Sequence, residues 1–172
     1  MAIFRAVLVV VFFVAACAPA PEPVGAPAED GSIPENESIS VNDTGHAALA
    51  RLDPALLAAV REAAVAAQAS RGVELKVTSG WRSAEYQQRL FDQAVERYGS
   101  EKEARRWVQP PDKSKHVTGQ AVDVGPTNAA DFLIQHGADY GLCQAYANEM
   151  WHFELLTSRG GECPQPVGDP AG

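Results

Sequence analysis

The sequence predicts an α+β fold, with a small, mainly antiparallel sheet and helices packed on one of its faces. Two patterns predict it: amphipathic helical periodicity, and short β-rich segments in which apolar and polar residues alternate. A chain of 172 residues with 46% hydrophobic residues has room for one domain with its own core. The formal net charge of −8 argues against nucleic acid as a partner, because phosphate binding needs a basic surface.

Two helices are predicted where capping signals enclose an apolar stripe. Asp53 and Pro54 form a favourable N-cap and first helical residue, and Gly72 stands where such a helix commonly ends. Ser83 is expected to start a second helix, which Gly99 would end.

Three strands and a further helix complete the predicted fold. Residues 73–78 alternate between apolar and polar side chains, and residues 120–124 and 150–156 are short β-rich segments. We expect a helix capped by Asn128 and ending near His136. This order of elements is typical of helices layered on a small antiparallel sheet.

The first residues have the features of an export signal. Residues 1–16 combine a positive Arg5 with an apolar run that is too short to span a bilayer. The run ends in an aliphatic residue, two small residues and Cys17, a pattern similar to a bacterial lipobox, so we expect a lipid anchor on Cys17. The alternative is ordinary secretory cleavage near Ala16 or Ala18. Both alternatives predict an exported protein.

Composition then divides the rest of the chain. Residues 17–45 contain few large apolar residues and are expected to be a disordered tether between membrane and domain. The folded domain is expected at residues 46–163, followed by a flexible tail at 164–172. We expect a monomeric lipoprotein anchored to the outer side of the membrane.

The cysteines fit an oxidising compartment. If Cys17 is lipidated, Cys143 and Cys163 remain as a pair, and we expect a disulfide between them. It would close a loop of about 20 residues, worth roughly 3 kcal/mol in the chain-entropy model. The alternative is two free buried thiols.

The segment from Ser114 to Asp123 contains two candidate metal ligands. On the predicted strand, Val122 faces the core and Asp123 faces the other side, because side chains alternate. Gly119 allows a sharp turn that brings His116 back toward Asp123.

A second segment, from Glu149 to Glu154, supplies the third candidate ligand. His152 completes a set of two histidines and one carboxylate, the ligand class of catalytic zinc with an open fourth position. Glu149 would reach the attacking water as a general base. We expect Trp151 and Phe153 in the core, and Glu154 as a structural partner for a lysine or arginine.

These residues resemble the zinc D-alanyl-D-alanine carboxypeptidases and dipeptidases of bacterial cell walls, including the vancomycin-resistance enzymes. That group belongs to the LAS metallopeptidases, which share their fold with some cell-wall endopeptidases and the hedgehog signalling domain. The resemblance covers about residues 50–157. It rests on three motif segments of this sequence: Ser79, Gly80, Trp81, Arg82 and Ser83; Ser114, His116, Gly119, Ala121 and Asp123; Glu149, Trp151 and His152.

The resemblance implies a role for each matching residue. His116, Asp123 and His152 would bind one zinc ion, and Glu149 would be the general base. Arg82 would stabilise the tetrahedral oxyanion. The implied substrate contacts are Gln87, toward the terminal carboxylate, and Ser114, toward the substrate backbone. The family's usual tyrosine after Gly80 is Trp81 here, which would reshape the edge of the pocket.

The expected function is therefore zinc-dependent removal of the terminal D-alanine from peptidoglycan stem peptides. One alternative is an L,D-carboxypeptidase or a peptidoglycan endopeptidase with the same metal site. A second is a non-catalytic, zinc-containing wall-binding lipoprotein. Glu149 and Arg82 argue against the second alternative, because a structural metal site needs neither a base nor an open position.

Overall fold

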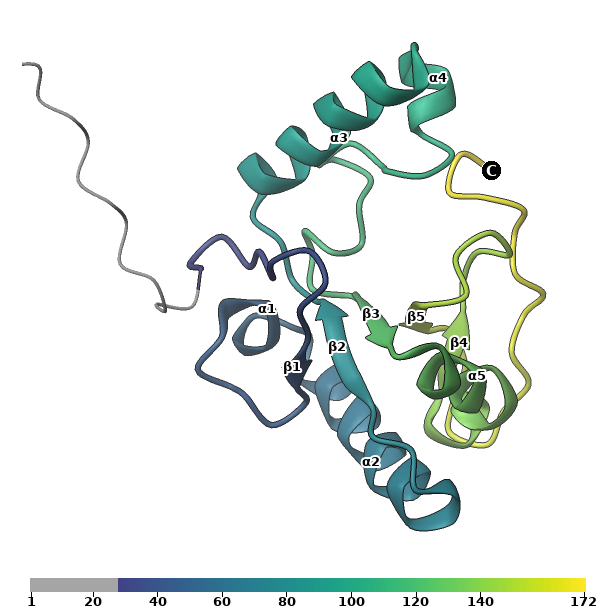
Figure 1. Ribbon diagram of the computed structural model, residues 1–172. Coiled ribbons are helices and arrows are strands. Elements are labelled where there is room, and N and C mark those ends of the chain that lie inside the picture. Colours follow the sequence, from purple (N-terminus) through teal and green to yellow (C-terminus); the bar gives the residue numbers. More distant parts are fainter. Residues whose placement is uncertain (1–27) are drawn as a thin grey trace, which may run out of the picture.

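The computed structural model describes residues 28–172 and confirms the α+β fold (Figure 1). Five strands form one antiparallel sheet in the order β1-β2-β3-β5-β4. The strands are β1 (Ile39–Ser40), β2 (Lys76–Ser79), β3 (Ala121–Gly125), β4 (Leu142–Gln144) and β5 (His152–Leu155). The helices are α1 (Ala47–Ala50), α2 (Pro54–Arg71), α3 (Ala84–Tyr98), α4 (Glu101–Ala104), α5 (Thr127–His136) and the 3₁₀ helix η1 (Gly137–Tyr140). None of the helices in the described part is both long and apolar enough to span a membrane.

The predicted helix ends are confirmed for α2 and α3. The Asp53 carboxylate accepts a hydrogen bond from the Ala55 amide at 2.8 Å, and Gly72 ends α2 in the left-handed conformation. The Ser83 hydroxyl caps α3 in the same way. The prediction that Asn128 caps α5 is wrong. The helix starts at Thr127, after Pro126, whose ring fixes the backbone φ angle, here −65°.

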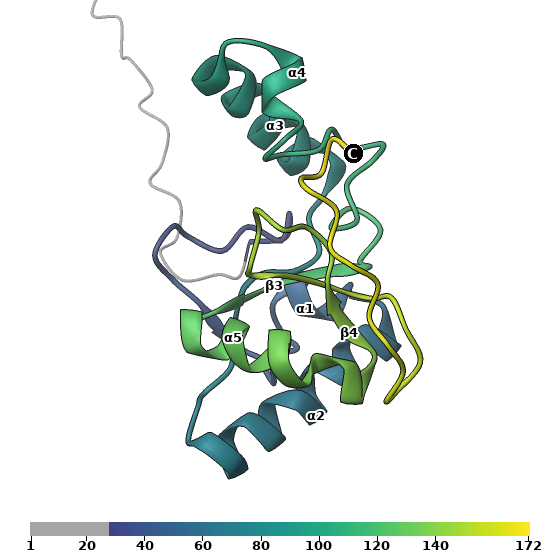
Figure 2. The ribbon, with the colours of Figure 1, turned by 90° about the vertical axis from the view of Figure 1, so that its right-hand side faces the viewer.

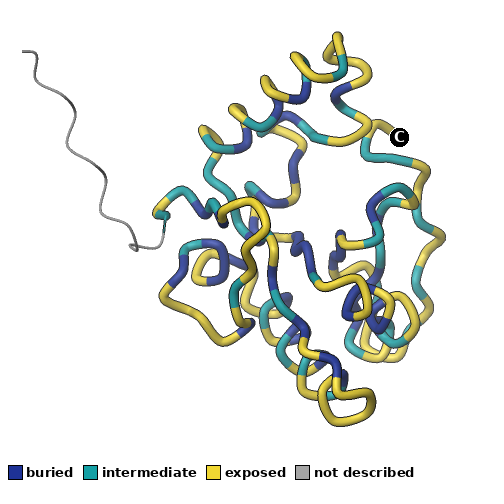
Figure 3. The backbone as a smooth tube through the Cα atoms, in the orientation of Figure 1, coloured by how far each residue is buried: buried dark blue, intermediate teal, exposed yellow. Residues whose placement is uncertain are grey.

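The helices lie in two layers, on opposite sides of the sheet (Figures 1 and 2). Helices α2 and α5 pack on one face of the sheet and on each other, as predicted, and bury the main core, which includes Val122 and Phe153. Helices α3 and α4 lie on the other side, where the sequence predicted no helices, with a small core of their own, formed by Phe91, Ala94 and Ala104. Figure 3 shows the buried residues concentrated along the strands and the inner faces of the helices.

Two strand predictions are displaced. The strand predicted at residues 73–78 pairs only at Lys76–Ser79, because Val73 and Leu75 are buried in the core without joining the ladder. The last strand starts at His152 rather than at residue 150. Trp151 therefore lies in the turn before β5, where strand alternation does not apply, and is 42% exposed instead of buried.

The predicted domain boundaries are too narrow at both ends. Residues 28–45 are not a disordered tether, because Ile39 pairs with Val77 in the sheet and Ile33 and Val41 are buried. These few apolar residues are too widely spaced to form a periodic pattern in the sequence. The tail at 164–172 also contacts the domain, through a backbone bridge at Val167. The predicted signal at 1–16 and lipidated Cys17 lie outside the described residues.

We predict that a chain beginning at residue 46 is less stable than one beginning at residue 28. It would lose the strand β1 and the buried side chains of Ile33 and Val41. The burial of each of these two side chains contributes roughly 1.5–3 kcal/mol to the free energy of unfolding. Urea unfolding followed by circular dichroism measures the difference in free energy of unfolding. Equal stability of the two chains would show that residues 28–45 add nothing to the fold.

Candidate metal centre

The site is built on the pairing of β3 with β5. In this register Asp123 lies opposite His152, and Ala121 lies opposite Glu154. Directly opposite residues point to the same face of the sheet, so Asp123, His152 and Glu154 share the face that looks toward α3. Val122 and Phe153 point to the main core, which confirms the predicted alternation for both segments except Trp151.

A loop brings His116 to the same place. Gly119 has φ +72° and lies so close to the Arg51 carbonyl that a β-carbon would meet it at 2.5 Å. Gly80 is equally confined, because a β-carbon there would meet the Ala48 carbonyl at 2.2 Å. The Gly80 carbonyl accepts a hydrogen bond from Nδ1 of His116 at 2.8 Å. The two glycines thus let separate backbone segments approach closely enough to fix this histidine.

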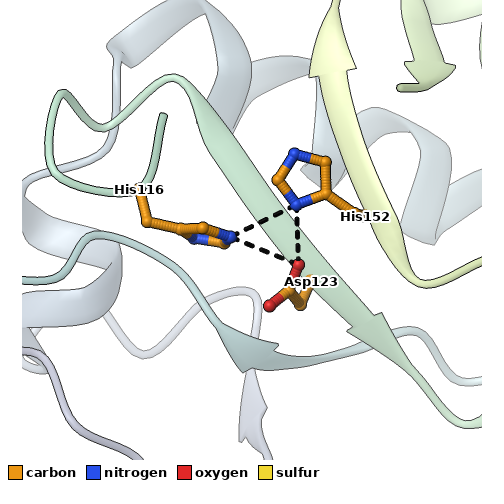
Figure 4. A group of neighbouring side chains, drawn as sticks. All are labelled: His116, Asp123 and His152. Carbon is orange, nitrogen blue, oxygen red and sulfur yellow. Dashed lines mark hydrogen bonds and ion pairs between the residues drawn. The ribbon is translucent and has the colours of Figure 1, made fainter. Parts of the chain in front are cut away.

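The three predicted ligands converge, with their side chains pointing toward one another (Figure 4). Nε2 of His116 lies 3.3 Å from Nδ1 of His152 and 3.4 Å from Oδ1 of Asp123. The third separation, from Nδ1 of His152 to Oδ1 of Asp123, is 3.2 Å. Tetrahedral ligands with bonds of about 2.0–2.1 Å lie about 3.3 Å apart. All three side chains are buried, so the triad has the spacing and donor types of a divalent metal site.

Outer hydrogen bonds decide which nitrogen of each histidine faces the centre. Because a carbonyl or a carboxylate only accepts, Nδ1 of His116 carries a hydrogen toward Gly80, and Nε2 of His152 donates to Oε1 of Glu154 at 3.0 Å. The inward nitrogens are therefore available as ligands. The predicted lysine or arginine partner of Glu154 is wrong, because Glu154 positions His152 instead. Residues two apart on a strand share a face, so the spacing of Glu154 and His152 could have indicated this role.

The electrostatics of the triad favour a bound cation. Burial alone would raise the pKa of Asp123, but His116 and His152 hold it well below its usual range. Burial and the nearby Arg82 lower the pKa of His116. Burial opposes ionisation of His152, yet its hydrogen bonds to Asp123 and Glu154 raise its pKa to about 9. Without metal, a proton on His152 balances the Asp123 charge.

Glu149 lies beside the triad without joining it. One carboxylate oxygen is 3.7 Å from Nδ1 of His152, which makes Glu149 a neighbour of the ligand cluster. Burial raises the pKa of Glu149 to about 7, and the Asp123 charge adds to this rise. A carboxyl group with that pKa can take up and return a proton near neutral pH.

Arg82 connects the ligand cluster to helix α3. Its guanidinium donates to Oδ2 of Asp123 at 3.0 Å and to the Ser79 hydroxyl at 2.8 Å. It also donates to Oε1 of Gln87 at 3.1 Å, and the Gln87 amide donates to the Gln109 carbonyl at 2.7 Å. Gln87 is 1% exposed, so this chain of hydrogen bonds fixes the guanidinium next to the metal ligands.

A cleft of about 450 Å³ opens onto the triad between the sheet and the α3–α4 layer. All seven predicted site residues line it: Arg82, Gln87, Ser114, His116, Asp123, Glu149 and His152. Tyr146 and Gln109 also line it and belong to none of the three motif segments, and Trp151, which the sequence predicted to lie in the core, lines it as well. Burial and the charges of Glu154 and Glu149 raise the pKa of Tyr146 to about 12, so its hydroxyl stays neutral. A hollow of about 620 Å³ beside residues 33–38 contains none of the triad.

The predicted disulfide is present between Cys143 and Cys163. Cys143 lies in β4, which pairs with β5, so the disulfide attaches the C-terminal segment directly to the sheet that carries His152. The loop that it closes contains Glu149 as well as His152, as expected from the sequence.

We predict that Glu154→Ala weakens Zn²⁺ binding by about 10–100-fold, because the substitution removes the acceptor that orients His152. Competitive titration against a chromophoric chelator measures the affinity. Glu154→Gln is the matched control: it keeps a carbonyl acceptor for the same N–H and should lose less. Wild-type affinity in the alanine variant would exclude this role for Glu154.

We further predict that Zn²⁺ binding near neutral pH releases about one proton. The His152 pKa of about 9 means that its ring is protonated in the metal-free protein, whereas Asp123 is already ionised. Affinity should then rise about tenfold per pH unit and level off above about pH 9. Calorimetry in buffers of different ionisation enthalpy measures the proton count. A binding enthalpy that does not depend on the buffer would contradict the prediction.

Comparisons with known proteins agree with this site. A family model described as VanY, D-alanyl-D-alanine carboxypeptidase, matches residues 50–158. No curated protein matches the chain.

Solved structures with the same fold include several peptidases. The vancomycin-resistance D,D-pentapeptidase VanY of a VanB-type cassette, in complex with Zn(II), is 25% identical with a TM-score of 0.59, over 73% of this chain and 83% of that one. The L,D-carboxypeptidase LdcB is 25% identical, with a TM-score of 0.53, over 60% and 58% of the two chains. DacB from Streptococcus pneumoniae D39 is 28% identical, with a TM-score of 0.50, over 61% and 66%. The family match covers well over half of the chain and includes the whole ligand triad, so this protein belongs to the VanY family of D-alanyl-D-alanine carboxypeptidases.

Proposed function

We propose that this protein is a zinc-dependent carboxypeptidase that removes the terminal D-alanine from peptidoglycan stem peptides. The observation that carries the proposal is the buried triad of His116, Asp123 and His152 at the base of an open cleft, with Glu149 beside it. Two histidines and one carboxylate are a ligand set of catalytic zinc, which leaves a fourth position open. A similar structure, that of VanYB, contains D-alanine-D-alanine.

In the proposed mechanism, His116, Asp123 and His152 would hold the zinc ion, which when bound would supply a Lewis acid for the scissile carbonyl and lower the pKa of water. Glu149 accepts a proton from the attacking water and returns it to the departing amine, which its pKa near neutrality allows. Arg82 lines the cleft within hydrogen-bond distance of Asp123, so its guanidinium would donate to the oxyanion as the carbonyl becomes tetrahedral. Ser114 and Gln87, which also line the cleft, would contact the substrate.

One alternative specificity has support. LdcB is an L,D-carboxypeptidase with an identity to this chain equal to that of VanYB. The same metal chemistry would then remove the D-alanine that follows an L-centre. Tetrapeptide and pentapeptide stems distinguish the two activities, because a D,D-enzyme acts on the pentapeptide.

We also propose that the protein is exported and anchored through Cys17. The sequence pattern around Cys17 supports the anchor, and the Cys143–Cys163 disulfide fits an oxidising compartment outside the cytoplasm. Metabolic labelling with a palmitate analogue tests the anchor, with Cys17→Ser as the control that should remain unlabelled.

We predict that the full-length chain releases D-alanine from a muramyl pentapeptide, that a chelator stops release and that Zn²⁺ restores it. Glu149→Gln should abolish turnover and keep stoichiometric zinc, because Glu149 lies outside the ligand triad. Released D-alanine is measured with D-amino acid oxidase, and zinc by elemental analysis.

Two results would contradict this proposal. Stoichiometric zinc without D-alanine release would exclude the carboxypeptidase activity and leave other wall bonds or a binding role. Loss of zinc together with turnover in Glu149→Gln would make Glu149 a ligand rather than the base.

A further inference from the structure

The C-terminal segment, residues 164–172, crosses between the two walls of the cleft. We call it the strap. It begins next to Cys163, which the disulfide joins to β4, and it runs past the sheet to the connection that follows α4 (Figure 1, yellow). One end of the strap is thus attached to the sheet, and the other lies against the α3–α4 layer.

The strap first binds the loop that carries Glu149. The Ala147 amide donates to the Val167 carbonyl at 2.7 Å, and the Val167 amide donates to the Ala145 carbonyl at 3.0 Å. These two hydrogen bonds form a short bridge between parallel segments on both sides of Tyr146. The strap therefore fixes the backbone of the loop just before the proposed general base.

The strap then binds the opposite wall. Asp169 forms an ion pair with Arg106 at 2.8 Å, and the Pro170 carbonyl accepts a hydrogen bond from the Gln109 side chain. The main-chain carbonyl of the same residue, Gln109, accepts the hydrogen bond from the Gln87 side chain. In addition, the Asn148 side chain donates to the Arg106 carbonyl at 2.8 Å, so the Glu149 loop and the α4 connection are joined directly as well.

At this position the strap forms part of the wall of the cleft. Pro170 lines the cleft together with Gln109 and Trp107 of the connection after α4, whereas Asp123 and His152 line it from the sheet. Tyr98 stacks on Trp107, with ring centroids 5.9 Å apart, and supports the same part of the wall. The opposite side of Arg82 and Asp123 opens into a second hollow, of about 790 Å³, which the strap does not line.

We propose that the strap determines the exo-specificity of the enzyme: it closes one exit of the cleft, so that a peptide substrate must end inside it. This inference rests on the proposed carboxypeptidase function and specifies its substrate as a chain terminus. A chain that continued past the scissile bond would meet Pro170 and the Asp169–Arg106 ion pair. The open hollow on the other side receives the rest of the substrate.

The test compares two peptides, a stem pentapeptide ending in D-Ala-D-Ala and the same peptide with an added triglycine tail. Mass spectrometry identifies cleavage of the D-Ala–D-Ala bond in each peptide, and kcat/KM is measured for wild type and for two variants of the full-length chain. One variant ends after Cys163, which keeps the disulfide, and the other is Asp169→Asn. We expect the ratio of kcat/KM for the extended peptide to that for the pentapeptide to rise at least tenfold in the truncated chain, roughly the discrimination of a steric contact.

Asp169→Asn should shift the ratio in the same direction by a smaller factor, because it detaches only the end of the strap. If the truncated chain does not fold, the Asp169→Asn variant alone tests the proposal. This variant should fold, because the substitution removes only an ion pair at the surface. Glu103→Gln is the matched control: it removes the other carboxylate paired with Arg106, at 3.4 Å, without touching the strap, and should leave the ratio unchanged.

The outcomes separate the two proposals. If wild type releases D-alanine and the folded strap variants keep the wild-type ratio, the strap is not the determinant and the proposed function stands. If wild type binds zinc and releases no D-alanine from the pentapeptide, the proposed function fails, and the inference about the strap fails with it.

Discussion

The antiparallel pairing of β3 with β5 is the constraint on which the rest of the site depends. It places Asp123 directly opposite His152, so two ligands lie on adjacent strands with their side chains on one face. With Val122 holding β3 in the main core, a one-residue shift of β5 would turn His152 into that core and bring Phe153 to the cleft. The burial of those two apolar side chains by α2 and α5 therefore maintains the register that the metal site requires.

Loop residues and hydrogen bonds around the site orient the two histidines, whose positions the strand register alone does not fix. Gly80 and Glu154 each bind the outer nitrogen of one histidine, which leaves two lone pairs and one Asp123 oxygen facing one point. Three inward acceptors repel one another unless a proton or a metal ion lies between them. The same geometry thus explains the raised pKa of His152 and the suitability of the site for a divalent cation.

The layer formed by α3 and α4 supplies the second wall of the cleft, opposite the sheet that carries Asp123 and His152. Helix α3 supplies Gln87, which binds Arg82, and the connection after α4 supplies Gln109, which binds Gln87. The strap joins that connection to the Glu149 loop. In our proposals, the metal ligands and Glu149 carry out hydrolysis, and the strap decides which peptides enter.

The sequence by itself determined the fold class, the caps of α2 and α3, the candidate metal-binding triad and the disulfide, because these follow from local periodicity, capping chemistry and motif spacing. Only the tertiary structure decided the role of Glu154, the exposure of Trp151, and the packing of residues 28–45 and of the strap. Those features depend on contacts between segments far apart in the chain. Such contacts leave no periodic pattern, since each involves a few isolated side chains or backbone groups whose partners the fold alone supplies.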